Sequence, residues 1–440
     1  MHKRVSGGVV SVEVCDGVLR ARGLPYGRAR RFEAAESAPA WTGERDATQP
    51  GPACPQRPSR LAFVSGPMLD GLRVDEDCLV LSVTAPQDAD GLPVMVWIHG
   101  GAYVAGSGES AKYDPAALVR EGDVVVVNIN YRLGIFGYLS PPGADADDNL
   151  GLRDQILALQ WVRDNIAAFG GDPANVTVFG QSAGGDSVLA LMLSPQGAGL
   201  FHRAIVQSAP LGVGTQNPAA AASREPLVHA MQSAMATSLA GVAPRDATYA
   251  QLLTAEAAAA TAVQRFGLVA SMAFAPLLGR DPLPPPAEID ERLAAAAGRI
   301  ELLIGYTRDD AAPFVAMDPR VKKLSAVGVA ERLAMRVMTP KLTARAFGGL
   351  VEPFVEMWRS HGGRAGSYRL DWRPAGSPLG ACHCIDLPLL FGAEGRWSDA
   401  PMLGPNRTVD SALGADLRSV WTGFAHSGIA ALPSEPLRFR

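Results

Sequence analysis

Cysteine is scarce in this sequence. The 440-residue chain contains five cysteines, namely Cys15, Cys54, Cys78, Cys382 and Cys384. The basic residues that open the chain are not followed by the apolar segment of a signal peptide. An odd cysteine count without an export signal argues against a disulfide framework. We therefore expect a cytoplasmic protein, which would instead be secreted if an export signal had been trimmed from the sequence.

The short motif Cys382-His383-Cys384 has the residue types of a metal site. Zinc sites need about four ligands, and no second Cys/His cluster supplies the others. We expect no metal at this motif.

The sequence also lacks a strong charge of one sign and a long hydrophobic run. Its 40 basic and 44 acidic residues give a net charge of −4, without a concentrated basic segment, so we expect no nucleic-acid partner. The longest apolar stretch, Phe266–Leu278, contains Gly267, Ser271 and Pro276, and we expect no membrane span. A hydrophobic content of 48% predicts a globular protein with a large core.

Apolar strands and helical segments alternate along most of the chain. Expected strands cover 78–84, 92–98, 123–130, 175–179, 203–207, 300–305 and 366–372, and expected helical segments cover 154–169, 182–193, 321–360 and 416–425. Continuous apolar runs indicate strands that are buried on both faces. The pattern predicts the α/β class, with a mostly parallel central sheet flanked by helices.

Three segments depart from this alternation. Residues 8–22 alternate around Asp16-Gly17, which predicts a small N-terminal antiparallel unit. Residues 28–60 are rich in Pro, Arg and Ala and are expected to form an irregular surface loop. Residues 211–300 are Ala-rich, and we expect a helical cap insertion that shapes the substrate cleft, with acyl-pocket residues from 211–280. The whole chain, 1–440, is expected to be a single domain.

The segment Gly180-Gln181-Ser182-Ala183-Gly184 lies between a predicted strand and a predicted helix. A G-x-S-x-G motif at such a turn is typical of a nucleophile elbow, which exposes the serine hydroxyl at the sheet edge. We therefore predict that Ser182 is a catalytic nucleophile.

A serine nucleophile needs a base, usually a histidine oriented by a carboxylate. In open α/β sheets these groups follow strands, in the order serine, acid, histidine. Of the seven histidines, His383 best fits this placement, because it follows the expected strand 366–372. The strand 300–305 leads to Asp309 and Asp310, between which composition does not choose, and the other aspartate is expected to cap the next helix.

Acyl transfer also needs N–H donors for the developing oxyanion. The segment Trp97–Tyr103 places His-Gly-Gly-Ala directly after an apolar strand. Its small residues let backbone amides approach a ligand closely. The amide of Ala183, beside the nucleophile, would be a further donor.

Together these motifs resemble the type-B carboxylesterases of the α/β-hydrolase fold, a family that includes bacterial p-nitrobenzyl esterases and cholinesterases. Further segments carry the resemblance over most of the chain: Glu76–Leu81 (EDCLVL), Asn130–Gly134 (NYRLG), Asn149–Gln155 (NLGLRDQ) and Phe169–Pro173 (FGGDP). The resemblance implies a triad of Ser182, Asp310 and His383, and so favours Asp310 over Asp309.

The same resemblance assigns supporting roles. It implies an oxyanion hole of Gly101, Ala102 and Ala183, and it makes Ser208 a residue that supports the acid. Gln181 stands where many members have glutamate, so less negative charge should face the site. Cys54 and Cys78 occupy positions where many members have a disulfide, and we expect them to be close but reduced.

We therefore expect a serine carboxylesterase that hydrolyses small-molecule esters through an acyl-enzyme, without a cofactor. One alternative is an amide, carbamate or lactone hydrolase with the same triad. A more remote alternative is a non-catalytic adhesion protein of the same fold, although such proteins typically lose the serine or the histidine. The natural substrate, the acyl-pocket residues, the enantioselectivity and the oligomeric state do not follow from the sequence.

Overall fold

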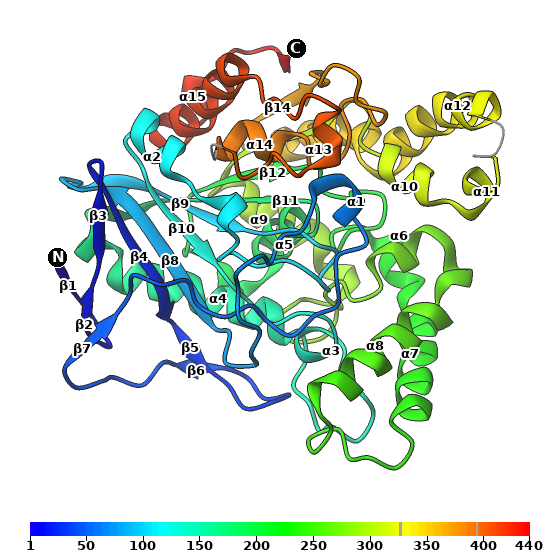
Figure 1. Cartoon of the computed structure of the whole chain (residues 1–440), viewed down its shortest axis with the longest axis horizontal. Coiled ribbons are helices and arrows are strands. Elements are labelled where there is room, and N and C mark those ends of the chain that lie inside the picture. The colour runs from blue at the N-terminus through cyan, green and yellow to red at the C-terminus, as the bar shows by residue number, and fades with distance from the viewer. Residues whose placement is uncertain (325–327, 393–394) are drawn as a thin grey trace.

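A ten-stranded sheet forms the centre of the computed structural model, which describes residues 1–324, 328–392 and 395–440 (Figure 1). The strand order is β15-β14-β13-β12-β11-β9-β10-β8-β4-β3. Their bounds are β3 (Glu13–Cys15), β4 (Val18–Pro25), β8 (Val80–Pro86), β9 (Leu92–Ile98), β10 (Val125–Ile129), β11 (Gly171–Gln181), β12 (Arg203–Gln207), β13 (Glu301–Thr307), β14 (Ala365–Leu370) and β15 (Leu437–Phe439).

Seven neighbouring strands, in the order β10-β9-β11-β12-β13-β14-β15, are parallel to one another. On the other side of β10, the strands β8, β4 and β3 follow, and each of these pairings is antiparallel. In β10 every residue is buried, because helices cover both faces of the parallel part. The predicted α/β class with a mostly parallel sheet is confirmed. The prediction missed β15, a short strand at the sheet edge.

The N-terminal region differs from the expectation of one small antiparallel unit. The hairpin around Asp16-Gly17 forms, but its strands β3 and β4 continue the main sheet. A separate sheet is made of β1 (His2–Val5), β2 (Gly8–Ser11) and β7 (Glu44–Asp46), in which β2 and β7 are parallel. The alternation in 8–22 could not show that the chain changes sheet between β2 and β3.

Residues 28–60 also differ from a simple surface loop. They contain the short strands β5 (Gly27–Arg28) and β6 (Glu36–Ser37), and the side chain of Phe32 is fully buried. Cys54 and Cys78 are buried free thiols, and a hydrogen bond from the Cys78 thiol to Cys54, together with burial, raises the pKa of Cys78. The two thiols therefore lie close together, and no disulfide joins them in this structure.

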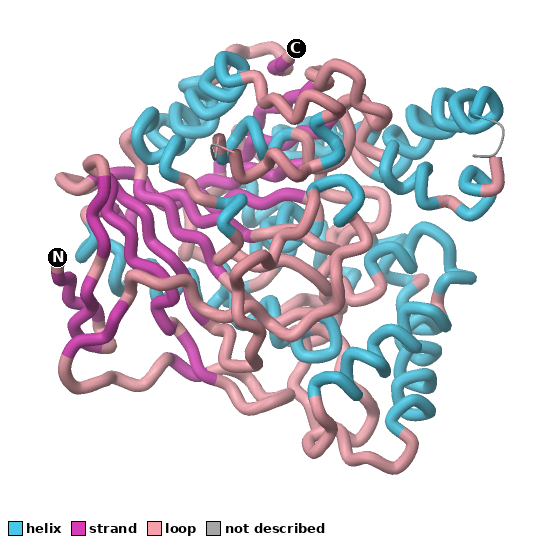
Figure 2. The backbone as a smooth tube through the Cα atoms, in the orientation of Figure 1, coloured by secondary structure: helices cyan, strands magenta, loops and turns pink. Residues whose placement is uncertain are grey.

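Helices pack on the sheet and extend beyond one of its edges (Figure 2). Those of the sheet layers include α2 (Ala116–Gly122), α4 (Leu150–Asn165), α5 (Ala183–Leu193), α9 (Ile289–Ala297), α13 (Val351–Ser360), α14 (Asp386–Phe391) and α15 (Ser411–Ser427). The shorter helices α1 (Ala62–Ser65) and α3 (Gly134–Gly137) lie in loops near the cleft described below. Among the described residues, no helix is both long and apolar enough to cross a membrane.

Two groups of helices extend beyond the sheet. The first contains α6 (Pro218–Ala222), α7 (Arg224–Leu239), α8 (Tyr249–Ala262) and the 3₁₀ segment η4 (Gln264–Met272). The second contains α10 (Ala312–Met317), α11 (Pro319–Lys322) and α12 (Gly328–Ala346). Part of the expected helical stretch 321–360, residues 325–327, lies outside the described residues. Figure 1 shows the two groups as neighbouring projections on the same side of the molecule.

The expected insertion 211–300 therefore has two parts in the structure. Helices α7 and α8 pack together and extend from the sheet, whereas α9 packs against α5 beneath it. Because α9 links β12 to the parallel strand β13, it acts as a sheet-covering crossover helix. The part of the insertion that extends from the sheet is therefore the part that precedes α9.

A buried ion pair joins two of the sequence motifs. Arg132 donates from Nε and Nη2 to the two carboxylate oxygens of Asp154, at 2.8 and 2.7 Å. Asp154 also accepts the backbone N–H of Arg132. This bidentate contact fixes the loop after β10 on α4, and so gives a structural reason for both motifs.

Candidate active site

Ser182 lies at the turn between β11 and α5. Its φ of 59° is unusual for a residue with a side chain. The two flanking glycines explain why the turn is possible: a Cβ on Gly184 would lie 2.0 Å from the carbonyl oxygen of Ile98, and one on Gly180 would lie 2.5 Å from the backbone of Gly184. Only glycine fits at these two positions, so the sharp turn presents Ser182, which is half-buried, to the cleft.

Asp310 and His383 meet at the same end of the sheet. Asp310 follows β13, and His383 lies between β14 and α14. The Nδ1 atom of His383 is 2.5 Å from Oδ1 of Asp310, and both side chains are fully buried. The backbone N–H of Thr307 donates to the other oxygen, Oδ2, at 3.1 Å. The carboxylate is therefore held in place to orient the imidazole.

Gln181 contacts the opposite nitrogen of the imidazole. Its Nε2 lies 3.3 Å from Nε2 of His383, and the Cys384 thiol donates to its Oε1 at 3.6 Å. If Nδ1 carries the proton that is shared with Asp310, Nε2 is free to accept from this amide. That tautomer is the one a general base needs. In the described part of the chain no hydrogen bond joins the Ser182 hydroxyl to His383, and the neighbouring residue Gln181 contacts Nε2 instead.

The His-Gly-Gly-Ala loop lies directly against Ser182. A Cβ on Gly100 would lie 3.1 Å from Cβ of Ser182, and one on Gly101 would lie 1.8 Å from the carbonyl oxygen of Ala105. Gly101 and Ala102 have φ values of 124° and 55°. Among the described residues, the N–H groups of Gly101, Ala102 and Ala183 have no acceptor. These amides are available to bind an oxyanion.

Two supporting roles differ from the sequence predictions. The Ser208 hydroxyl is buried and has no hydrogen-bond partner among the described residues, so the predicted support of Asp310 by Ser208 is not formed. Thr307 supplies that support through its backbone. Asp309 does not cap the next helix, because α10 begins after Ala311 without a side-chain cap. Instead Oδ2 of Asp309 accepts the N–H of Ala381 at 2.9 Å, which ties down the loop that carries His383.

Two buried carboxyl groups near the site were missed from the sequence. Oδ2 of Asp186 accepts from the hydroxyls of Tyr103 and Thr215 at 2.7 and 2.8 Å, and so joins the His-Gly-Gly-Ala loop, α5 and the start of the insertion. Asp386 follows His383 in the chain and accepts from Gln207 at 2.6 Å. Burial raises the pKa of Asp386 to about 6. Neither residue lies in a motif with a recognisable spacing, so only the packing shows them.

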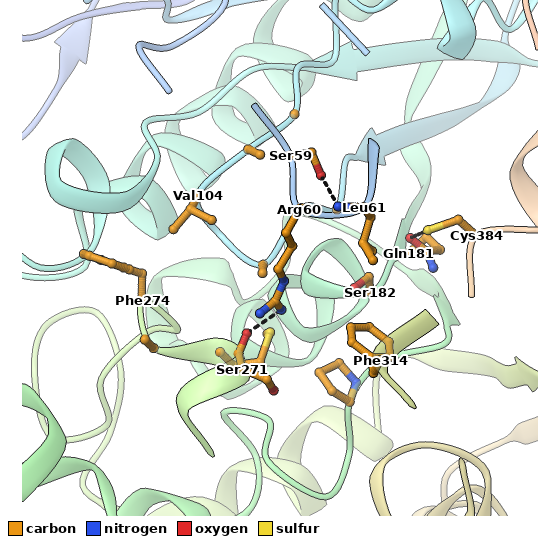
Figure 3. Close-up of a pocket in the computed structure, with 18 of the residues that line it drawn as sticks. Ser59, Arg60, Leu61, Val104, Gln181, Ser182, Ser271, Phe274, Phe314 and Cys384 are labelled. Atoms are coloured by element: carbon orange, nitrogen blue, oxygen red, sulfur yellow. Dashed lines mark hydrogen bonds between the residues drawn. The ribbon is translucent and has the colours of Figure 1, made fainter. Parts of the chain in front are cut away.

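A cleft of about 370 Å³ opens onto Ser182. Its walls come from the loop 57–68, the His-Gly-Gly-Ala loop, α8, η4, α10 and α12. Figure 3 shows Ser182 and Phe314 on one side and Val104 and Phe274 across from them. Phe314 and Phe347 also pack on the His383 ring, with centroids 5.2 and 5.3 Å away. A mostly apolar cleft with a few polar groups suits a small organic substrate.

Comparisons with known proteins agree with this arrangement. A family model described as the carboxylesterase family matches residues 4–348. A protein named probable N-octanoylanthranilate hydrolase, from Rhodococcus erythropolis, is 39% identical over 98% of this chain and 94% of its own. The para-nitrobenzyl esterase of Bacillus subtilis is 36% identical over 94% of this chain and 87% of its own.

A solved structure gives the same result. A thermophilic PNB esterase superimposes with a TM-score of 0.80 at 34% identity, over 97% of this chain and 91% of that one.

Proposed function

Since this chain belongs to the carboxylesterase family, has the α/β-hydrolase fold and is a carboxylic-ester hydrolase, we propose that it works through a Ser182–His383–Asp310 triad and an acyl-enzyme. The observation that carries the proposal is the 2.5 Å contact of Asp310 with Nδ1 of His383, beside the strained turn at Ser182. A lone buried histidine would not need an oriented carboxylate on one nitrogen.

In this mechanism Ser182 attacks the ester carbonyl while Nε2 of His383 takes its proton. Asp310 stabilises the imidazolium that forms. The amides of Gly101, Ala102 and Ala183 receive the negative charge on the carbonyl oxygen. His383 then gives the proton to the departing alkoxide, and water attacks the acyl-enzyme through the same base.

Ser182→Ala tests this proposal. We expect hydrolysis of p-nitrophenyl butyrate to fall at least 10³-fold, because the nucleophile is removed while the fold is kept. The matched control is Ser360→Ala, an exposed serine on α13. A second measurement is mass spectrometry after organophosphate treatment, which should place the label on the peptide that contains Ser182. Near wild-type activity in Ser182→Ala, or a label elsewhere, would refute the assignment.

Amide hydrolysis by the same triad is a second candidate. It is favoured by the relative that is named for N-octanoylanthranilate, in which the acyl group is carried on nitrogen. The two candidates are compared with p-nitrophenyl octanoate and octanoyl p-nitroanilide, which share the acyl chain and the ring. A kcat/KM for the anilide within tenfold of that for the ester would favour the amide; an undetectable anilide rate would remove it.

A further inference from the structure

Arg60 is an exposed residue on the wall of the cleft, where it contributes a positive charge. It lies just before α1, in the loop 57–68, and its side chain reaches across the cleft in Figure 3. One nitrogen, Nη2, donates to the backbone carbonyl of Ser271 at 2.7 Å. The guanidinium carbon lies 5.9 Å from the centroid of the Phe314 ring.

This charge is open to solvent and is not paired with a carboxylate of the described residues. Among the described residues Arg60 forms no ion pair, and its only hydrogen bond is the one to Ser271. The acidic residue on the cleft wall, Glu256, interacts with Arg57 and not with Arg60. A guanidinium has five N–H donors, so most of those on Arg60 remain available to an acceptor in the cleft.

The position of Arg60 indicates which part of the substrate, the acyl chain or the leaving group, it would contact. The Phe314 ring that it approaches packs edge-on against His383. In the proposed mechanism His383 gives a proton to the departing group, so that group lies on the His383 side of Ser182. Arg60 is therefore placed to contact the leaving group rather than the acyl chain.

We propose that Arg60 determines specificity by binding a carboxylate on the leaving group of the substrate. This inference rests on the proposed serine mechanism. Guanidinium matches a carboxylate through two parallel hydrogen bonds, and the adjacent Phe314 ring suits an aromatic leaving group. The substrate class is then an acyl ester or amide of an aromatic hydroxy or amino acid.

Two sets of substrates separate this role from a merely structural one. The isomers of carboxyphenyl butanoate carry the charge, and the matching acetylphenyl butanoates have a neutral group of similar size. The readout is the ratio of kcat/KM for the charged ester to that for the neutral one. Comparing this ratio between variants cancels differences in intrinsic reactivity and in the amount of folded enzyme.

In Arg60→Gln we expect the ratio to fall at least tenfold for the isomer that wild type prefers, as for loss of a charge-assisted hydrogen bond. Arg60→Lys should give an intermediate ratio, because an ammonium keeps the charge but not the bidentate geometry. The control is Arg73→Gln, an arginine of the same N-terminal region that pairs with Asp75 outside the cleft. It should keep the wild-type ratio.

A ratio in Arg60→Gln within twofold of wild type would overturn the inference, and would leave Arg60 as a tie between its loop and η4. Wild-type enzyme that hydrolyses the acetylphenyl esters but none of the carboxyphenyl esters would also overturn it. The proposed serine mechanism fails on a different result, which is retention of acetylphenyl ester hydrolysis in Ser182→Ala.

Discussion

At the scale of single residues, the site depends on which groups face His383. Asp310 contacts one imidazole nitrogen, and the neutral amide of Gln181 contacts the other. The amide is itself held by the thiol of Cys384. Because Gln181 carries no charge, it contacts the imidazole without adding a negative charge that would stabilise the protonated ring.

Gln181→Glu should therefore change the pH dependence of catalysis. An added carboxylate near His383 favours the imidazolium, so more alkaline conditions are needed to give the neutral base. We expect the acidic limb of the kcat/KM profile to move up by about one pH unit. The profile is measured with p-nitrophenyl butyrate, and Gln87→Glu, at an exposed glutamine directly after β8, serves as the control. An unchanged acidic limb would mean that residue 181 does not influence the base.

Gly184→Ala should destabilise the protein. The new Cβ would lie 2.0 Å from the carbonyl oxygen of Ile98, a backbone atom that cannot move away easily. Overpacking of this kind costs about 1–3 kcal/mol or more. Chemical denaturation compares this variant with Gly423→Ala, where the nearest atom would lie 3.8 Å away. Equal stability of the two variants would contradict the packing argument.

At the scale of secondary structure elements, the proposed triad depends on loops held at the ends of β13 and β14. Asp309 accepts the N–H of Ala381 and also donates its own backbone N–H to the carbonyl of that residue. Its carboxylate also pairs with Arg308. These contacts align the loop that carries His383 with the loop that carries Asp310.

Asp309→Ala should lower kcat more than it changes KM. Loss of the tie lets His383 move relative to Ser182, and a displacement of about 1 Å at a catalytic group can cost about 10²-fold in rate. We expect a decrease in kcat of about tenfold or more, with secondary structure retained by circular dichroism. The control is Asp290→Ala on the exposed side of α9. Wild-type kcat in Asp309→Ala would show that the loop is held without this carboxylate.

At the scale of the whole molecule, one buried carboxyl group links α8 of the insertion to α3. Glu256 of α8 accepts the N–H of Ile135, in α3, at 2.9 Å. Burial raises the pKa of Glu256 from 4.5 to about 7, against the opposing effects of that hydrogen bond and of Arg57. Between these two pH values the folded protein binds a proton that the unfolded chain releases. Folding stability from this group is thus complete below pH 4.5 and declines as the pH rises towards 7.

Glu256→Gln should remove that decline. The amide keeps an acceptor for Ile135 but has no charge to bury, so the variant should gain on wild type as the pH rises. Between pH 5 and pH 8 the difference in the free energy of unfolding between variant and wild type should change by about 2.5 kcal/mol. Urea denaturation at pH 5 and pH 8 measures it, with the exposed Glu225→Gln on α7 as the control. Parallel pH dependences of wild type and Glu256→Gln would contradict the prediction.

Much of the fold and part of the site could be predicted from the sequence. The strand Leu92–Ile98 and the strand Arg203–Gln207 have the predicted bounds, because continuous apolar runs are a local signal of a buried parallel strand. The turn at Ser182 was predictable for a similar reason, since the glycines that it requires lie beside it in the chain.

Only the tertiary structure decided which groups meet. Asp309 and Asp310 are chemically identical neighbours, and the choice between them depends on the direction in which β13 delivers each side chain. The same holds for Ser208, whose hydroxyl lies buried without contacting Asp310, and for Arg60, which looks like one more arginine in an irregular loop. Sequence patterns determine local backbone and burial, whereas contacts between residues far apart in the chain depend on the packing of every element between them. The sequence by itself therefore determined the sheet and the serine turn, and the packing decided the surroundings of His383 and the charge in the cleft.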